Sequence, residues 1–262
     1  MNISFSDLPI GPYTEEMVKE QWNGVIKTRG VKEGRCEVVN LDGENVLQVT
    51  FQKGEVGPDA NGVSWNHRLG GSFDEYTVEY KVRVSEDFNY IRGGKLPGLT
   101  GGSSPSGGAS TKNADGFSVR VMWREIGVLE QYVYHMNRKE GKQWGTDYLW
   151  STSENKGQVI DGDLWNTLST QFKDRVYLTS GKWHTVKIYI KMNTPGNEDG
   201  KIISWFDGVE VLNLDMEFRK DESFAIDSFK FTTFFGGNEP SWAPERDEKI
   251  YFKDFVFDRI RK

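Results

Sequence analysis

Apolar and polar residues alternate along much of this chain, and a period of two restricts it to folds built from β-strands. The clearest run is 76–84, where tyrosine and valine alternate with threonine, glutamate, lysine and arginine. Further strands are predicted at 38–41, 46–52, 183–191, 201–207, 209–214, 229–235 and 250–257. Many short strands, turn residues between them and almost no helical period predict an all-β sandwich of two antiparallel sheets.

The chain contains 262 residues, a normal length for one large β domain, and neither a repeat nor a low-complexity tract indicates a second module. We therefore expect a single domain over residues 1–262. Only residues 14–22 have the pattern of a helix, with Thr14 as its N-cap and acidic residues in its first turn. This helix is expected to close one end of the sandwich, and the strand at 250–257 is expected to pair in the centre of a sheet.

Residues 117–134 predict a β-hairpin, because two strand-like runs are joined by a short segment that ends in glycine. A three-residue loop of Glu125, Ile126 and Gly127 would place the glycine at the left-handed position of a common hairpin turn. Pairing Arg124 with Val128 then fixes the register of the two strands.

That register sorts the hairpin side chains onto two faces. It pairs Arg120 with Tyr132 and Ser118 with Tyr134, so these four residues share one face. The alternate residues of the first strand are apolar and are expected to face the core: Phe117, Val119, Val121 and Trp123. The polar face indicates a binding or catalytic surface, although the solvent side of an ordinary antiparallel sheet would also be polar.

Seven segments, taken in chain order, carry a family resemblance. They are VLQVTFQKGEVGP at 46–58, LGGSFDE at 69–75, GGKLPGL at 93–99, FSVRVMWR at 117–124, YVY at 132–134, GKWHTV at 181–186 and FFGGNEPSWAP at 234–244. Together they resemble polysaccharide lyase family 14, the alginate and glucuronate lyases, with the glucuronan lyases of family 20 as neighbours. The sequence departs from that pattern at Val119, where threonine is expected, and at Thr100, where no cysteine is present. The resemblance implies a concanavalin-like β-jelly roll whose concave groove cleaves a polyuronate by β-elimination.

The resemblance also implies roles for residues of this chain. The catalytic lysine of the family corresponds to Lys95, its tyrosine pair to Tyr132 and Tyr134, and its serine and arginine to the substrate-binding Ser118 and Arg120. An anionic polysaccharide requires a locally positive groove, because the net charge of the protein is −6. Further candidates to line that groove are Arg68, Arg92, Arg124 and the nearby His67.

The chemistry of such a cleavage can be assigned to these residue types. Elimination removes the proton on C5 and expels the 4-oxygen, so the uronate carboxylate must be neutralised, a base must take the proton and an acid must protonate the oxygen. Arg120 can bind the carboxylate, and Ser118 can add a hydrogen bond. Tyr132 and Tyr134 are the candidate base and acid if a cation such as Lys95 lowers a phenol pKa, although Lys95 itself could be the base.

The stereochemistry of the sugar narrows the expected substrate. In mannuronate and glucuronate the C5 proton and the 4-oxygen leave from the same side, so one tyrosine could serve as both base and acid. We therefore predict cleavage of alginate rich in mannuronate, or of polyglucuronate, in preference to polyguluronate. Activity is expected to rise toward alkaline pH.

Two stretches leave more than one interpretation open. The Gly- and Ser-rich residues 97–116 form the least structured part of the sequence, and we predict a mobile flap over the groove. Residues 137–180 contain scattered aromatic residues that either stack on sugars or anchor loops: Trp144, Tyr148, Trp150 and Trp165.

Composition excludes several other functions. The acidic net charge argues against a nucleic-acid partner, which would need a basic surface. Cys36 is the single cysteine, so no intramolecular disulfide can form, and no apolar run of about eighteen residues indicates a membrane span.

We expect a secreted or extracellular monomer, in mature form without its signal peptide, that needs no cofactor. Acidic residues at 193–200 could hold a structural calcium ion, although the spacing of a calcium-binding loop is absent.

Two other classes of protein are compatible with a sandwich of this kind. A glycoside hydrolase would need paired carboxylates on either side of the scissile bond, and we expect the polar face to carry no acid. A non-catalytic module that binds acidic polysaccharides would use the same fold and aromatic residues without acid–base groups. The combination of Lys95, Arg120 and two tyrosines favours the lyase.

Overall fold

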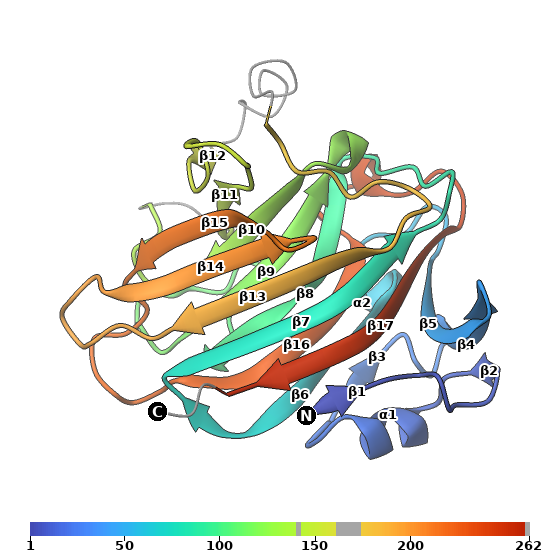
Figure 1. The fold of residues 1–262 in the computed structure, drawn as a ribbon, viewed down its shortest axis with the longest axis horizontal. Helices are drawn as coiled ribbons and strands as arrows, with labels where there is room; N and C mark the ends of the chain where they lie inside the picture. Colours follow the sequence, from blue (N-terminus) through green and yellow to red (C-terminus); the bar gives the residue numbers. More distant parts are fainter. Residues whose placement is uncertain (140–142, 161–173, 260–262) are drawn as a thin grey trace.

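The structure, a computed structural model, describes residues 1–139, 143–160 and 174–259. Its strands form two antiparallel sheets packed face to face, which confirms the predicted all-β sandwich (Figure 1). The nine-stranded sheet contains, in spatial order, β15 (Val209–Met216), β14 (Gly200–Phe206), β13 (His184–Lys191), β7 (Glu75–Val84), β17 (Glu248–Asp258), β5 (Glu44–Phe51), β4 (Cys36–Leu41) and β2 (Gly11–Pro12), with β1 (Asn2–Ile3) also paired to β17. The eight-stranded sheet contains β12 (Val159–Ile160), β11 (Thr146–Leu149), β10 (Leu129–Tyr134), β9 (Gly116–Arg124), β8 (Gly93–Gly102), β16 (Ile226–Phe235), β6 (Val63–Phe73) and β3 (Thr28–Arg29).

The strands predicted from alternation are all present. Burial alternates residue by residue along β7, as the pattern at 76–84 predicted. The C-terminal strand β17 lies between β7 and β5, which confirms its predicted central position. The core lies between the two sheets and is built from the inward-facing residues of both.

Strand β8 differs from the prediction, because residues 97–102 are strand and only the residues after Gly102 form a loop. The glycines that suggested a loop instead allow close packing. A Cβ on Gly98 would lie 1.9 Å from the carbonyl oxygen of Val119, so only glycine lets β8 approach β9 at this point.

The predicted N-terminal helix is present as α1 (Glu15–Gln21), and Thr14 caps it by accepting a hydrogen bond from the backbone of Met17. Val18 and the following Trp22 are fully buried. The Trp22 ring packs against aromatic residues of both sheets, including Phe229 and Phe255, so the helix closes one end of the core as predicted. In the described part of the chain, no helix is long and apolar enough to cross a membrane.

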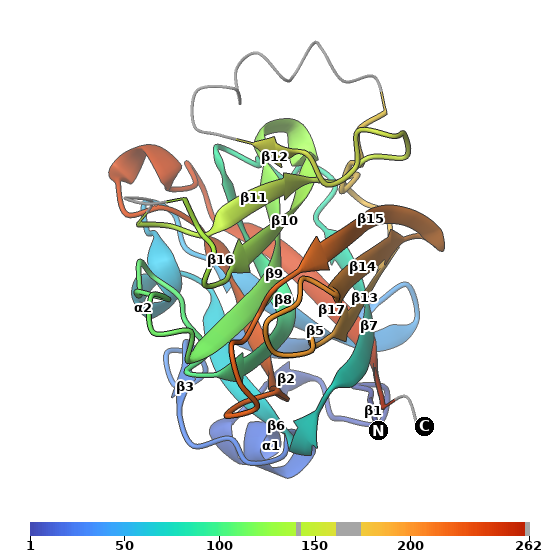
Figure 2. The same cartoon turned by 90° about the vertical axis from the view of Figure 1, so that its left-hand side faces the viewer.

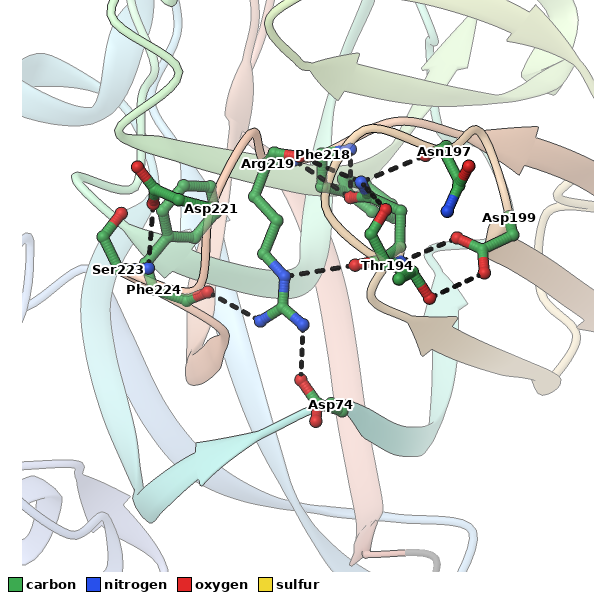
Figure 3. A network of polar contacts seen from close by, with 10 residues as sticks. Asp74, Thr194, Asn197, Asp199, Phe218, Arg219, Asp221, Ser223 and Phe224 are labelled. Carbon is green, nitrogen blue, oxygen red and sulfur yellow. Dashed lines mark hydrogen bonds and ion pairs between the residues drawn. The ribbon is translucent and has the colours of Figure 1, made fainter.

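A polar network joins the connections between strands at another end of the sandwich (Figure 3). Buried Asn193 donates to the carbonyl of Arg219 over 2.9 Å, and the guanidinium of Arg219 forms an ion pair with Asp74 at 2.9 Å. Both carboxylate oxygens of Asp199 accept hydrogen bonds from Thr194. Asp199, one of the acidic residues considered for calcium, therefore has a protein partner here, and the described residues contain no group of three His, Cys, Asp or Glu side chains that could hold a metal ion.

The hairpin between β9 and β10 turns through η1 (Glu125–Gly127). Gly127 has a φ of +85°, which confirms the predicted left-handed glycine. Ile126 before it also has a positive φ of +56°, a conformation that the branched Cβ of isoleucine disfavours. Since the Ile126 side chain is 62% exposed, little packing compensates this backbone strain.

We expect Ile126→Asn to raise the free energy of unfolding by about 0.5–1 kcal/mol, because asparagine tolerates the left-handed region better. Chemical denaturation would measure the change. Val209→Asn is the matched control, since Val209 is β-branched and 52% exposed but lies in a strand, where asparagine brings no gain. An equal response of the two variants would contradict the strain at Ile126.

Candidate active site

A groove of about 1550 Å³ lies on the outer face of the eight-stranded sheet. Side chains of β6, β8, β9, β10 and β16 line it. The segment 24–29, the short helix α2 (Gly57–Ala60), the loop 103–107 and the turn η2 (Pro240–Trp242) also contribute to its lining. Figure 2 shows α2 and the orange-red η2 on the outer side of this sheet.

The hairpin of β9 and β10 has the predicted register. Arg120 lies opposite Tyr132 and Ser118 lies opposite Tyr134, and the backbone N–H of Arg124 donates to the carbonyl of Val128 over 2.7 Å. The residues predicted to face the core are all fully buried in it: Phe117, Val119, Val121 and Trp123. The structure therefore brings the four polar residues to the outer face of the sheet.

Lys95 reaches the same face from β8, where it pairs with Met122 of β9. Its side-chain nitrogen contacts the sulfur of Met122 and lies 3.6 Å from the centroid of the Tyr132 ring. Burial, followed by the positive charges of Arg124 and Arg120, lowers the pKa of Lys95 well below its ordinary value of 10.5. Lys95 therefore loses its proton readily, and its neutral amine can act as a base.

The pKa of Tyr132 is shifted in the opposite direction from that of Lys95. Burial, followed by the neighbouring Tyr134, raises the pKa of Tyr132 well above its ordinary value, while Arg120 lowers it by less. A net lowering of the phenol pKa, the condition set for these roles, is thus not met at Tyr132, because burial outweighs the effect of Arg120. The Tyr132 hydroxyl accepts a hydrogen bond from the backbone of Gly145 at 3.0 Å and lies 3.5 Å from the Tyr134 hydroxyl. A phenol that keeps its proton is suited to act as an acid.

Arg120 is a buried cation, and no residue that the structure describes provides it with a counterion. Only 3% of the residue is exposed, and its guanidinium carbon lies 5.5 Å and 5.9 Å from the ring centroids of Tyr132 and Tyr134. Within the described residues its guanidinium forms no ion pair, and the buried Nε has no hydrogen-bond acceptor. A buried guanidinium without partners costs free energy, so the site favours an incoming anion such as a carboxylate.

Ser118 is on the predicted face but does not line the groove. Its hydroxyl is fully buried and donates to the carbonyl of Pro105 over 2.7 Å. The same loop donates from Gly108 to the hydroxyl of Tyr134 over 2.9 Å, and its Thr111 donates to the carbonyl of His135 over 2.7 Å. The loop thus covers Ser118 and contacts the site, while its mobility as a flap stays a prediction.

His67 does not lie in the groove, which differs from its predicted role. Alternation along β6 places it with Trp65 on the inner face, where its ring centroid lies 4.8 Å from that of Phe257. Its Nδ1 accepts a hydrogen bond from the backbone of Asn23 over 2.9 Å, and burial lowers the pKa of His67 to about 4. The neighbouring residue Arg68 points outward and lines the groove as predicted.

Arg92 and Arg124 also line the groove, and both guanidinium groups lie over the ring of Trp242, at 4.9 Å and 5.7 Å from its centroid. Trp242 packs against the cluster of Met122 and Tyr132 that surrounds Lys95. Its position within the segment FFGGNEPSWAP offered no signal that the side chain would reach the site.

The polar face contains acids, so the prediction that it carries none is wrong. Glu130 is fully buried and accepts a hydrogen bond from Nε of Arg124 at 2.6 Å, and Asp147 of β11 accepts one from Nη2 of the same guanidinium at 3.0 Å. Burial raises the pKa of Glu130 well above its ordinary value. Glu130 could have been found from its spacing, since it is two residues before Tyr132. The two carboxylates share one arginine instead of flanking a space for a sugar, which does not fit a glycoside hydrolase.

The aromatic residues of 137–180 separate into two groups. Trp144 is exposed and lines the groove, which leaves sugar stacking as a prediction for this residue. Tyr148 and Trp150 are buried in the core and anchor their segment. Trp165 lies outside the described residues.

The fold and the groove define a β-sandwich protein with a long, cation-lined groove on one sheet. The family model for polysaccharide lyase 14 matches residues 40–255, and the chain belongs to polysaccharide lyase family 14. No curated protein matches the chain in sequence.

Solved alginate lyases have the same fold, which makes the sandwich a β-jelly roll of this family. Alginate lyase Aly36B is 24% identical with a TM-score of 0.79, covering 100% of this chain and 97% of its own. The PL-14 alginate lyase from Aplysia kurodai is 24% identical with a TM-score of 0.75, covering 98% and 97%. Alginate lyase vAL-1 from Chlorella virus is 22% identical with a TM-score of 0.70, covering 96% and 99%.

The lowered pKa of Lys95 predicts how stability depends on pH. We expect Lys95→Met to raise the free energy of unfolding at pH 7 by about 1 kcal/mol, the usual scale of a single substitution, because methionine has no charged form that burial disfavours. Folded Lys95 releases its proton at a lower pH than an unfolded lysine, so the wild-type protein gains stability as pH rises toward 10.5. The advantage of the variant should therefore shrink over that range.

Urea denaturation at a series of pH values would measure both proteins. Lys81→Met is the control, because a hydrogen bond to Asp254 raises the pKa of Lys81, whose side chain is partly exposed in its ion pair. An advantage of Lys95→Met that does not change with pH would contradict the lowered pKa.

Proposed function

We propose that this protein cleaves a polyuronate rich in mannuronate or glucuronate by β-elimination and leaves an unsaturated uronate at one new chain end. The observation that carries the proposal is the buried guanidinium of Arg120 beside Lys95 and Tyr132, which has no ion-pair partner in the described part of the chain. One contact cluster thus contains an anion-binding group, a base and an acid. We further propose that the protein acts outside the cell as a monomer, because its polymeric substrate is found there.

In the proposed reaction, these groups remove one proton from the sugar and donate another to the leaving oxygen. Arg120 binds the carboxylate of the uronate, which makes the C5 proton more acidic. The neutral amine of Lys95 takes that proton, the electrons of the C5–H bond form the C4=C5 double bond, and the C4–O4 bond breaks. Tyr132 donates its phenol proton to the departing 4-oxygen, and a proton from Lys95 or water restores the phenol.

The proposed base and acid lie on the same side of the bound sugar. This arrangement suits substrates in which the C5 proton and the 4-oxygen leave from one side. Lys95 and Tyr132 are in contact on one face of one sheet, so both approach the sugar from that face. Mannuronate and glucuronate place the C5 proton and the 4-oxygen on the same side, as this arrangement requires. Guluronate places them on opposite sides and fits less well.

The comparisons support an acidic polysaccharide as substrate. Aly36B variants lacking a lysine and a methionine, or a lysine and a tyrosine, are solved in complex with an alginate trisaccharide and an alginate tetrasaccharide. Lys95 here contacts a methionine and a tyrosine, Met122 and Tyr132. An endo-β-1,4-glucuronan lyase from Trichoderma reesei, 15% identical with a TM-score of 0.55, keeps polyglucuronate as a second candidate.

The function is tested by following ultraviolet absorbance of the unsaturated product with polymannuronate, polyglucuronate and polyguluronate. We expect absorbance to rise with one of the first two polymers. Lys95→Ala and Tyr132→Phe should each lower kcat/KM by about 10²–10⁴-fold, the usual contribution of acid–base groups. Lys81→Ala, on the opposite sheet, is the control. Binding of these polymers without any absorbance change would instead indicate a carbohydrate-binding module.

The proton affinity of Lys95 predicts the pH profile of cleavage. We expect kcat/KM to rise as Lys95 loses its proton and to level off below pH 10.5, since its pKa is lowered. Asp147 raises and Arg124 lowers the pKa of Lys95. Asp147→Asn should therefore shift the rising limb to lower pH, and Arg124→Gln should shift it to higher pH. Shifts in the same direction, or none, would argue against Lys95 as the base.

A further inference from the structure

Cations line the groove on one side of Arg120 across several strands. The strand registers place Tyr132, Arg120, Gly98 and Lys230 in one line across β10, β9, β8 and β16. Because Gly98 has no side chain, no β8 side chain stands between Arg120 and Lys230 in this line. The next strands are β6 and β3, and Arg29 of β3 lines the same groove.

Lys230 is largely buried and forms no ion pair within the described residues. Its side-chain nitrogen donates to the carbonyl of Ser104 over 2.9 Å and to the hydroxyl of Ser106 over 3.3 Å. Burial, followed by the positive charges of Arg120 and Arg29, lowers the pKa of Lys230 to about 7. An anion bound near these three groups would reduce their repulsion and favour the charged form of Lys230.

The positive charge continues along the segment that leads into β3. Arg29 forms an ion pair with Asp59 at 2.9 Å, but the two side chains are 41% and 83% exposed. Ion pairs this exposed contribute only about 0–1 kcal/mol, so Arg29 can exchange Asp59 for a carboxylate of a ligand. Lys27, two residues earlier, is exposed and lines the groove as well.

On the other side of Arg120, toward β10 and β11, acidic side chains lie among the cations. There the guanidinium of Arg124 is bound by the carboxylates of Glu130 and Asp147. Neighbouring strands lie about 4.8 Å apart, so the four strand steps from β9 to β3 span about 19 Å. Toward β3, the cations that line the groove therefore extend far beyond the reacting groups.

We propose that Lys230, Arg29 and Lys27 form a cationic arm that binds carboxylates of several uronates on one side of the cleaved bond, and that the arm makes the protein select long chains over short oligosaccharides. The inference rests on the proposed function and adds its preference for chain length.

The test measures binding separately from cleavage. In a Lys95→Ala background, calorimetry would compare polymannuronate with its di-, tetra- and hexasaccharides. Adding Lys27→Gln and Arg29→Gln should weaken binding of the polymer about three- to tenfold, since exposed charge contacts are each worth up to about 1 kcal/mol. Binding of the disaccharide should not change, because a disaccharide bound at Arg120 is too short to reach Lys27 and Arg29. Added salt should weaken polymer binding less in this variant.

The matched control adds Lys19→Gln and Lys32→Gln, which remove two exposed lysines outside the groove. Equal polymer affinity in the arm variant and the control would overturn the inference. An equal loss for polymer and disaccharide would also overturn it, since the arm would then not act through chain length. If wild-type protein cleaves no polyuronate but its binding still depends on the arm, the proposed function fails and the cationic arm is supported.

Discussion

Burial of a positive charge without a counterion is the constraint on which the groove depends. Arg120 lies close to the rings of the two tyrosines, its Nε is buried without an acceptor, and no acid of the described chain neutralises it. This arrangement costs free energy. It persists because the alternate residues of the same strand, Val119 and Val121, are fixed in the apolar core between the sheets. The sandwich thereby maintains a site whose missing charge a ligand must supply.

The same burial gives Lys95 and Tyr132 opposite tasks. Removing water disfavours the charged form of each group, so it lowers the pKa of the lysine and raises that of the tyrosine. Burial therefore favours the neutral form of both groups, in which the lysine can accept a proton and the tyrosine can donate one. Neighbouring cations strengthen the effect on Lys95 but oppose it on Tyr132. Desolvation thus explains the assignment of base and acid better than pairwise charge does.

Local sequence patterns predict most of the sandwich but only part of the site. Alternation and one hairpin register place Arg120, Tyr132 and Tyr134 together, because both depend on residues close in the chain. Lys230 and Asp147 join them from β16 and β11, and no local pattern says which strands become neighbours. The alternation of side chains along β6 likewise turns His67 toward the core. The bounds of β6 were needed to see this, because the sequence alone did not indicate where this strand begins and ends.

The distribution of charge explains how a protein with a net charge of −6 can attract an anionic polymer. On the nine-stranded sheet, cations are paired with acids, as in Lys81 with Asp254 and Lys253 with Glu44. Along the groove, Arg120 and Lys230 have no acid partner in the described chain. Salt screens charges more than about 8–10 Å apart, so acids on the far sheet weaken the attraction little. The local excess of unpaired cations, rather than the net charge, therefore determines what the groove binds.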